Sequence, residues 1–368
     1  MPRILITADT VGGVWTYAVE LACALDARGV QVAIASMGAP LAPHQREELA
    51  CNPGVMLFES QYRLEWMQDC WDDVDTAGRW LLQLEQEFQP DVVHLNQYAF
   101  GNLPFRAPTV VVAHSCVLSW WKAVHGVAAP AEWDTYRRRV AQGLAGASLV
   151  AAPTQAMLST LADNYDHAGG GFVIPNGAAA ACFKPARKQP CVLAAGRFWD
   201  AAKNIAALEK VAPHVPWPVK VAGSATHPDG GTVVPKHVQF LGELSRPALA
   251  RQLAAASIYA LPARYEPFGL SVLEAALSGC ALVLGDIPSL REVWGDAAVY
   301  VPPSNDDVLR RTLLRLMDDP DERARYAQAA RLRARQFTPA RTCDGYLDAY
   351  ARLSPGFTPQ PAEELACV

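Results

Sequence analysis

The chain has 368 residues, of which 51% are hydrophobic and 19% charged, a length and composition that suit two soluble globular domains rather than one core. Its net charge of −5 divides unevenly, because residues 1–170 carry 10 basic and 18 acidic side chains. This acidic half argues against a nucleic-acid or anionic-membrane surface there. The remainder is mildly basic, which suits a small anionic ligand or reflects chance variation. No apolar run reaches about 18 residues and no basic leader precedes the first strand, so we expect neither a membrane span nor a secretion signal. The nine cysteines include no C-x-x-C pair, so we expect reduced thiols in a cytoplasmic protein rather than a disulfide framework.

Short apolar runs alternate with amphipathic stretches through the first half. RILITA (3–8) reads as a buried strand, and the helical pattern that follows it ends at Gly29. A Trp-rich helix is predicted over about 66–88, and another over 154–165 with Thr154 as its N-cap. Further strands are predicted at 31–36, 55–59, 91–95, 109–114 and 148–153. This alternation predicts a parallel sheet with helices on both faces.

The alternation breaks near 166–190, where glycine and proline gather and predict a hinge, and then it restarts. Strands are predicted at 191–196, 218–223, 238–242, 257–262, 281–285 and 298–302, with helices at about 203–212, 245–256, 271–279, 304–318 and 320–335. A last helix at about 338–353 has no strand after it, so we expect it to pack back across the hinge. The predicted domains are 1–170 together with this helix, a hinge at 171–190, and 191–337.

Two open α/β sheets joined by a hinge usually bind a ligand in the cleft between them, at the loops that follow the strands. DTVGGVW (9–15) is one such loop, and its glycines would let the backbone approach an anion at a helix start, or simply make a tight turn. It is not G-x-G-x-x-G, and no acidic residue follows the second strand, so dinucleotide binding is not supported. His114 ends another strand and could bind a hydroxyl or be a satisfied core histidine. The next segment, WWKAVHG (120–126), is expected to form an aromatic loop.

GRFWDAAKN (196–204) follows the first strand of the second half. Arg197 and Lys203 flank a loop that opens a helix, and two cations beside a helix start would suit a pyrophosphate. A single cation at such a place is more often solvated surface.

RYEPFGLSVLEAALSGC (264–280) contains two glutamates. Pro267 and Gly269 prevent a helix from running through Glu266, which places Glu266 on a loop and Glu274 in the first turn of a helix. Ser271 and Glu274 also fit the capping box S-x-x-E, which would account for Glu274 structurally. The backbone amides from Phe268 to Leu270 would suit an anion or sugar hydroxyls.

Asp73 and Asp75 form a D-x-D pattern that can hold a metal on a nucleotide-sugar. They lie within the Trp-rich helix among further acids, which favours a solvated acidic face. No histidine or cysteine spacing matches a zinc pattern, and we expect no metal site.

These stretches together resemble glycosyltransferase family 4, whose members are retaining enzymes with the GT-B fold. The matches span nearly the whole chain in order: Gly12-Gly13, His114, IPNG (174–177), GRFWDAAKN, FLGEL (240–244) and EPFGLSVLE, the last being the E-x7-E signature of the family. The resemblance implies an α/β protein of two Rossmann-like, doubly wound parallel-sheet domains facing a cleft. It also implies that the C-terminal helix crosses back to the first domain.

The resemblance assigns a role to each matching residue. Arg197 and Lys203 would hold the donor diphosphate, Glu274 the ribose hydroxyls, and Glu266 the C3 and C4 hydroxyls of the donor sugar. Amides of Phe268, Gly269 and Leu270 would contact sugar and phosphate, and the base would lie near Leu244. Gly12 and Gly13 would approach the phosphate, and His114 would meet the C6 side of the sugar and the acceptor. Two departures stand out: Trp15 lies where a hydroxyl residue is frequent, and the 200–202 loop is unusually apolar.

The resemblance thus implies a metal-independent, retaining transfer of a hexose from a nucleoside-diphosphate sugar, with UDP-glucose favoured, to a hydroxyl acceptor. The acceptor stays open among a sugar, a lipid-linked sugar and a small molecule, in polysaccharide, glycolipid or glycoconjugate synthesis. We expect no cofactor and no nucleic-acid partner, and weak peripheral membrane contact stays open. The alternatives are a GT-B epimerase acting on the nucleotide-sugar alone, and a non-catalytic sugar-binding or scaffold relative.

Overall fold

The computed structural model describes residues 1–50, 52–167, 170–227, 230–233 and 235–359. The chain divides into two compact units, each built on a parallel sheet. The first unit contains residues 1–118, 129–176 and the chain from Pro339, and the second contains residues 119–128 and 177–338. Residues 119–128 therefore belong to the second unit, although they precede the linker in sequence. No helix among the described residues is both long and apolar enough to cross a bilayer.

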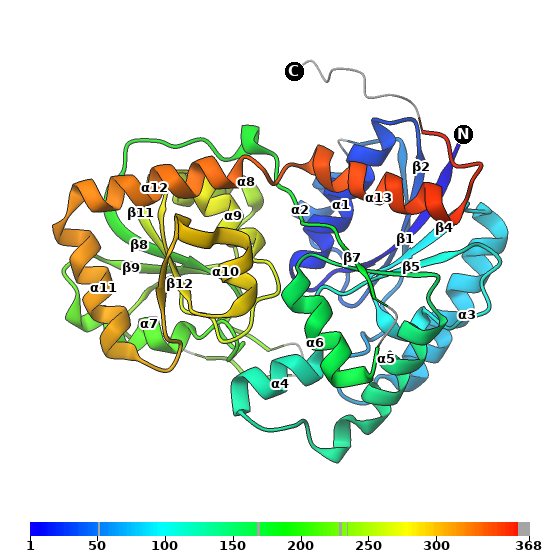
Figure 1. Cartoon of the computed structure of the whole chain (residues 1–368), viewed down its shortest axis with the longest axis horizontal. Coiled ribbons are helices and arrows are strands. Elements are labelled where there is room, and N and C mark those ends of the chain that lie inside the picture. Colours follow the sequence, from blue (N-terminus) through cyan, green and yellow to red (C-terminus); the bar gives the residue numbers. More distant parts are fainter. Residues whose placement is uncertain (51, 168–169, 228–229, 234, 360–368) are drawn as a thin grey trace. The chain divides into compact units, whose positions relative to one another are not determined.

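The first unit has a seven-stranded sheet in the order β3-β2-β1-β4-β5-β6-β7 (Figure 1). Its central strand β1 (Arg3–Asp9) carries Ile4, Leu5 and Ile6, all with no exposed surface, as expected of a strand covered on both faces. The other strands are β2 (Gln31–Met37), β3 (Val55–Glu59), β4 (Val92–Leu95), β5 (Thr109–Val112), β6 (Leu149–Ala152) and β7 (Phe172–Val173). The helices are α1 (Gly13–Asp26), α2 (Pro43–Ala50), α3 (Trp71–Phe88), α5 (Asp134–Gly146), α6 (Gln155–Tyr165) and α13 (Pro339–Leu353). Helix α4 (Val117–His125) begins in the first unit, but its residues from Ser119 onward belong to the second.

The second unit has a six-stranded sheet in the order β10-β9-β8-β11-β12-β13. Its strands are β8 (Gln189–Ala195), β9 (Val219–Ala222), β10 (Gln239–Gly242), β11 (Ala256–Leu261), β12 (Ala281–Gly285) and β13 (Val299–Val301). Its helices are α7 (Ile205–Val211), α8 (Arg246–Ala255), α9 (Leu270–Leu277), α10 (Pro288–Trp294), α11 (Asp306–Asp318) and α12 (Pro320–Ala334). Every strand pair described in both sheets is parallel, which confirms the predicted doubly wound α/β class.

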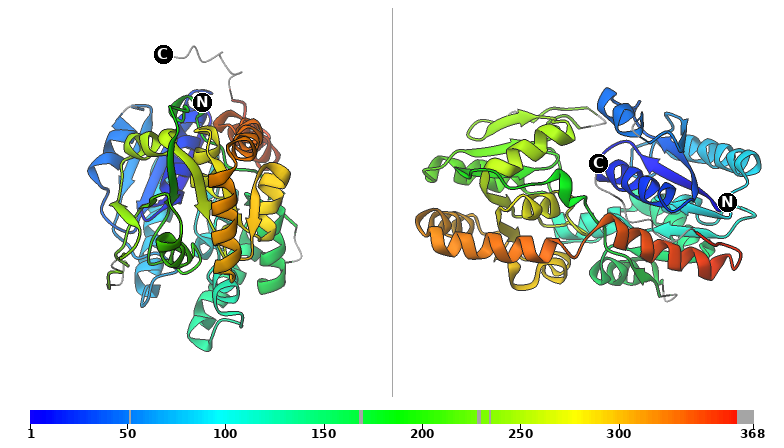
Figure 2. Two further views of the ribbon diagram at one scale, coloured as in Figure 1. Left: turned by 90° about the vertical axis from the view of Figure 1, so that its left-hand side faces the viewer. Right: turned by 90° about the horizontal axis from the view of Figure 1, so that it is seen from above.

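Helix α13 returns to the first unit and lies alongside α1, red beside blue in Figures 1 and 2. Tyr346 and Tyr350, one turn apart, have no exposed surface. The Tyr350 hydroxyl lies 2.7 Å from Nδ1 of His94 on β4, whose Nε2 lies 3.2 Å from the Tyr17 hydroxyl on α1. Burial lowers the pKa of His94 to about 3, so the ring is neutral at neutral pH and can donate one hydrogen bond and accept another.

Two local predictions were wrong, and one short strand was not predicted. The Trp-rich helix begins at Trp71 rather than near 66, because Asp69 has a left-handed backbone (φ +46°) that an α-helix cannot include. Residues 120–126 are mostly helical, not a loop: α4 runs to His125 and ends where Gly126 takes φ +73°. The short strand β7 lies inside the predicted hinge.

Candidate active site

The loop after β8 carries the two cations that the sequence singles out. The Arg197 guanidinium donates to Asp200 Oδ2 at 2.8 Å and lies 4.9 Å from the Trp199 ring centroid. Two backbone bonds tighten this loop, from Asp200 N to the Arg197 carbonyl and from Lys203 N to the Asp200 carbonyl. Arg197 and Lys203 are thereby presented from one compact turn that leads into α7.

Asp200 is a buried acid at the candidate site that the sequence did not single out. Its side chain is 3% exposed, and Oδ1 accepts hydrogen bonds from the Ala202 amide at 3.0 Å and the Trp120 indole at 2.9 Å. Burial alone would raise the pKa of this carboxyl, but the charges of Arg197 and Lys203 and the hydrogen bonds from Trp120 and Arg197 together lower it. Asp200 is therefore ionised and holds Arg197 in place. The signal in the sequence was the acidic residue three positions after Arg197, close enough to pair with it.

Asn204 is a second residue near the candidate site that the sequence did not single out. It adopts the left-handed conformation (φ +55°) as the residue before α7, and its amide donates to the carbonyls of Pro262 at 2.9 Å and Pro303 at 2.8 Å. These prolines follow β11 and β13, so one side chain ties together the loops at the carboxyl ends of three strands. The Arg264 amide adds a bond to the Ala202 carbonyl at 2.8 Å.

Lys203 and Glu266, 63 residues apart in sequence, form an ion pair. Lys203 Nζ lies 2.5 Å from Glu266 Oε2, and the two side chains are only 18% and 11% exposed. Ser289 Oγ donates to the Glu266 carbonyl at 2.5 Å and fixes the backbone beneath it. The pair is partly desolvated, so its charges act more strongly on a ligand than surface charges would.

The start of α9 differs from the capping box that the sequence predicts. The N-cap is Gly269, not Ser271, and no side chain caps the helix. Ser271 Oγ accepts instead from the Tyr259 hydroxyl at 2.7 Å and donates to the Ala195 carbonyl at 3.4 Å, which anchors α9 to the end of β8. The capping-box account of Glu274 is therefore wrong. Glu274 is 6% exposed within α9, and its role as a ribose ligand stays a prediction.

The remaining donor contacts predicted in the second unit are hydrophobic residues with buried or partly buried side chains. Phe268 is 2% exposed and packs edge-on against Phe337, with ring centroids 5.6 Å apart. Leu270 begins α9 and Leu244 precedes α8, and both are partly buried against the core of the second unit. The structure thus brings Lys203 and Glu266 into direct contact, and Arg197 and Lys203 both lie close enough to Asp200 to lower the pKa of its carboxyl.

The position of Gly269 does not tolerate a side chain. Its φ of +90° is a conformation that L-residues rarely adopt, and an added Cβ would meet Val272 Cγ2 at 2.9 Å. We expect Gly269→Ala to destabilise the second unit by about 2 kcal/mol, from backbone strain plus this contact. Gly126→Ala is the matched control, because Gly126 also has a positive φ (+73°) but nothing within 4 Å of an added Cβ. Urea unfolding should show a smaller loss for the control, and equal losses would contradict a role for the Val272 contact.

In the first unit, the glycine pair forms the turn between β1 and α1. Gly12 has φ +112° and is the N-cap of α1, and both glycines are exposed. The Asp9 carboxylate accepts the Val11 amide at 2.6 Å and shapes the turn. Trp15 lies in the core at 2% exposure, and its indole donates to Glu48 at 2.9 Å, so it packs rather than lining the turn.

His114 follows β5 in the same unit and is partly buried. Its Nε2 lies 2.8 Å from Asn96 Oδ1, and its ring packs edge-on against Tyr17 at 4.4 Å. Because Asn96 Oδ1 is an acceptor, Nε2 carries the proton and Nδ1 is the acceptor. Burial lowers the pKa of His114 to about 3, so a neutral imidazole is available at physiological pH.

The D-x-D acids lie on α3 and are engaged by neighbours: Asp73 accepts the Arg63 amide at 2.9 Å, and Asp75 pairs with Arg139. Among the residues that the structure describes, no group of three or more His, Cys, Asp or Glu side chains is placed to hold a metal ion.

Comparison with known proteins settles the family. Residues 11–180 match the family described as Glycosyltransferase Family 4, and residues 185–333 match that described as Glycosyl transferases group 1. The chain belongs to glycosyltransferase family 4. This family 4 chain is 34% identical over 132 residues to the D-inositol 3-phosphate glycosyltransferase of Salinispora arenicola, a match that covers 35% of this chain and 30% of that enzyme. The chain spans less than half the length of the curated relatives that it matches.

Solved structures show the GT-B fold for this family 4 chain. Sucrose-phosphate synthase from Thermosynechococcus elongatus superposes with a TM-score of 0.82 at 18% identity, covering 96% of this chain and 99% of that one. Anabaena HepE in complex with UDP-glucose superposes with a TM-score of 0.75 at 17% identity, covering 96% and 100%.

Proposed function

We propose that this chain transfers a hexose from a nucleoside-diphosphate sugar to a hydroxyl acceptor, with retention of configuration at the anomeric carbon and without a metal. The observation that carries the proposal is the partly buried Lys203–Glu266 pair beside Arg197 in a family 4 chain. Cations at the carboxyl ends of parallel strands suit a diphosphate, and a carboxylate beside them suits sugar hydroxyls.

The proposed division of roles follows the family pattern. Arg197 and Lys203 bind the diphosphate, Glu266 the sugar and Glu274 the ribose. The amides of Phe268, Gly269 and Leu270 contact sugar and phosphate, and Leu244 lies by the base. From the first unit, Gly12 and Gly13 approach the phosphate, and His114 serves the sugar and the acceptor.

The chemistry rests on stabilising the leaving group. When the bond from the anomeric carbon to the phosphate oxygen breaks, the departing diphosphate gains negative charge, which Arg197 and Lys203 oppose. Glu266 and Asp200 are each held by a cation, so neither is disposed to act as a nucleophile. The acceptor hydroxyl therefore attacks from the face that the phosphate leaves, and its proton passes to a phosphate oxygen. Neutral His114 contributes hydrogen bonds rather than charge.

UDP-glucose is the donor we favour. A fold neighbour, Anabaena HepE, was solved with UDP-glucose, and the mildly basic second half of the chain suits a diphosphate. The test is to screen UDP-glucose, UDP-galactose and GDP-mannose for thermal stabilisation, and to measure nucleotide release with and without acceptors in the presence of EDTA. Anomeric NMR couplings of the product report retention. Conversion of the donor sugar without an acceptor would point to an epimerase instead.

Glu266→Ala separates sugar binding from nucleotide binding. We expect UDP affinity to be kept, because the change leaves both cations in place, while UDP-glucose affinity falls toward that of UDP as the sugar loses a charge-assisted hydrogen bond. Calorimetry with both ligands measures the ratio. The paired surface acid Asp306, changed to alanine, is the control. A collapse of UDP binding in Glu266→Ala would show that the division of roles is wrong.

A further inference from the structure

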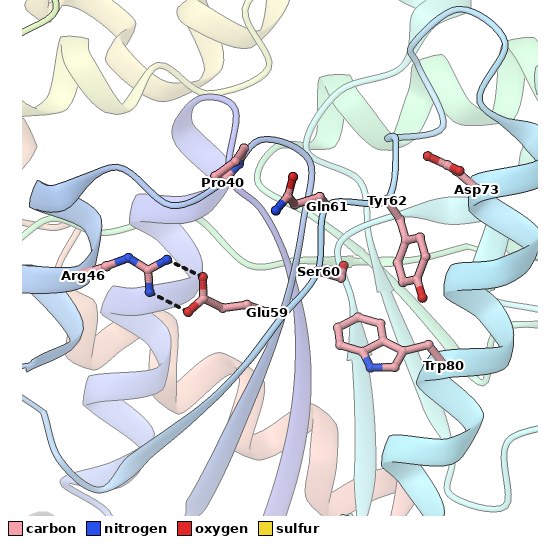
Figure 3. A pocket seen from close by; sticks show the side chains of 8 residues that line it. All are labelled: Pro40, Arg46, Glu59, Ser60, Gln61, Tyr62, Asp73 and Trp80. Atoms are coloured by element: carbon pink, nitrogen blue, oxygen red, sulfur yellow. Dashed lines mark hydrogen bonds and ion pairs between the residues drawn. The ribbon is translucent and has the colours of Figure 1, made fainter.

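A hollow lies in the first unit, and Asp73 of the D-x-D pattern is the one lining residue already described. It has a volume of about 520 Å³, within the usual range of ligand pockets, and opens at the carboxyl ends of β2 and β3 (Figure 3). Its lining consists of Pro40, Arg46, Glu59, Ser60, Gln61, Tyr62, Asp73 and Trp80. None of these residues belongs to the proposed donor or acceptor contacts.

The hollow has two chemically different sides, which Figure 3 shows on either side of Ser60. On one side the Arg46 guanidinium makes a two-pronged ion pair with Glu59, with N–O distances of 2.5 and 2.7 Å. On the other side Tyr62 and Trp80 pack together with ring centroids 5.8 Å apart, and both keep part of their surface exposed. One side thus offers directional hydrogen bonds, and the other offers flat apolar surface.

The walls are fixed by the backbone beneath them. Ser60 donates twice to the Ser36 carbonyl, from its amide at 3.0 Å and from its hydroxyl at 2.7 Å. The Tyr62 carbonyl accepts the Gly38 amide at 2.9 Å. The segments after β2 and β3 are therefore held together before any ligand arrives, which reduces the entropic cost of binding.

The charge of the lining narrows the ligand class. Glu59 neutralises Arg46, and Asp73 adds a negative charge, so the hollow disfavours phosphate and other anions. A neutral ligand with several hydroxyls and a flat apolar face fits both sides: its hydroxyls meet Arg46 and Glu59, and its ring lies against Trp80. A hexose unit has these properties.

The position relates the hollow to the proposed transfer. Thr10, next to the glycine-pair turn, donates through its hydroxyl to the Ala39 carbonyl at 2.8 Å, and Pro40 is the next residue on the rim. Strands β1, β2 and β3 are successive neighbours, so their carboxyl ends lie about 10 Å apart from first to last. That span suits a sugar unit attached to the one that reacts.

We propose that this hollow binds a hexose unit of a neutral oligosaccharide acceptor, beyond the unit that receives the transferred sugar. The inference rests on the proposed function for its role in transfer. Binding of a neutral oligosaccharide to the hollow does not depend on that function. The proposal also specifies the acceptor as a glycan chain rather than a small aglycone.

Binding of maltoheptaose, cellohexaose and mannohexaose, measured by calorimetry on the full chain, tests the site. We expect at least one of these probes to bind and Trp80→Ala to weaken that binding at least tenfold, while Trp80→Phe keeps most of it. Trp71→Ala is the matched control, because Trp71 lies on the same helix, is partly exposed, and packs under Arg139 instead of lining the hollow. It should stay within twofold of wild type.

A separate titration with UDP-glucose keeps the two proposals distinguishable. Trp80→Ala should leave UDP-glucose affinity within twofold of wild type and raise the KM for the oligosaccharide without changing kcat at saturation. If none of the three oligosaccharides binds the wild type, or if Trp80→Ala and Arg46→Ala bind as well as wild type, the inference is overturned. If UDP-glucose and the other donors fail to bind while the oligosaccharide result holds, the proposed transfer is wrong and the sugar site stands.

Discussion

Lys203→Ala is expected to weaken UDP binding by about a hundredfold. The change removes a charge-assisted hydrogen bond to the diphosphate, worth about 1.5–3 kcal/mol. It also leaves the Glu266 side chain, only 11% exposed, without its cation and beside an anionic ligand. Together these effects amount to about 3 kcal/mol, which corresponds to roughly two orders of magnitude in Kd. Isothermal calorimetry with UDP measures the change directly.

Arg197→Ala should act in the same direction, and Lys210→Ala provides the matched control. Lys210 lies at the far end of α7, 69% exposed, and pairs at 3.0 Å with Asp306 on the surface. Its loss should leave UDP affinity unchanged, because exposed ion pairs contribute little. Unchanged affinity in both Arg197→Ala and Lys203→Ala would remove the diphosphate assignment.

The strands could be predicted from the sequence because they are buried on both faces. In RILITA (3–8) only Arg3 keeps part of its surface exposed, and the nearly continuous apolar run after it is typical of an interior parallel strand. The N-cap at Thr154 was equally readable, and its hydroxyl accepts the Met157 amide at 3.1 Å. Strand β7 could not be read this way, because Phe172 and Val173 are each more than a third exposed and follow three glycines.

The site was predictable as a set of positions but not as a set of contacts. Arg197 and Lys203 could be marked because each stands beside a glycine or a helix start. The Lys203–Glu266 pair joins residues from the loops after β8 and β11, which become neighbours only when those strands pair. Ser271 shows the opposite error: S-x-x-E has a local meaning, but Gly269 takes the N-cap and Ser271 turns to Tyr259. A local motif yields when the tertiary structure offers its side chain a buried partner.

Three buried groups in the first unit should make its stability depend on pH, namely His94, His114 and Glu65. His94 has a pKa of about 3 in the folded state, from burial, against about 6.5 when unfolded. Between these two pH values the unfolded chain holds one more proton than the folded chain, so the free energy of unfolding rises by about 1.4 kcal/mol for each unit that the pH rises. The stability that neutral His94 contributes is therefore lost progressively as the pH falls below 6.5. Burial raises the pKa of Glu65 to about 7, although the hydrogen bonds that its carboxylate accepts from the Tyr98 and Ala99 amides, at 3.0 and 2.8 Å, act to lower that pKa.

Glu65 therefore acts with the opposite sign. Between about pH 4.5 and 7 the folded chain holds the extra proton, so the free energy of unfolding falls by about 1.4 kcal/mol for each unit that the pH rises. From pH 5 to 6 Glu65 opposes His94 and His114, whose contributions have the same sign because burial lowers the pKa of both rings to about 3. His94→Gln should lower the slope of unfolding free energy against pH by about 1.4 kcal/mol per unit relative to wild type, and Glu65→Gln should raise it by the same amount.

Urea unfolding at pH 5, 5.5 and 6, followed by hydrogen exchange in β1 and β4, measures these slopes for the first unit. Comparing slopes rather than stabilities separates titration from packing, because a cavity or a lost hydrogen bond shifts the free energy equally at every pH. Tyr350→Phe is the control: it removes a partner of His94 without removing a group that titrates in this range, so it should lower stability and leave the slope near that of wild type. Slopes that coincide in His94→Gln and wild type would mean that His94 is protonated in the folded protein, and the neutral His94 hydrogen-bonded to Tyr17 and Tyr350 would be wrong.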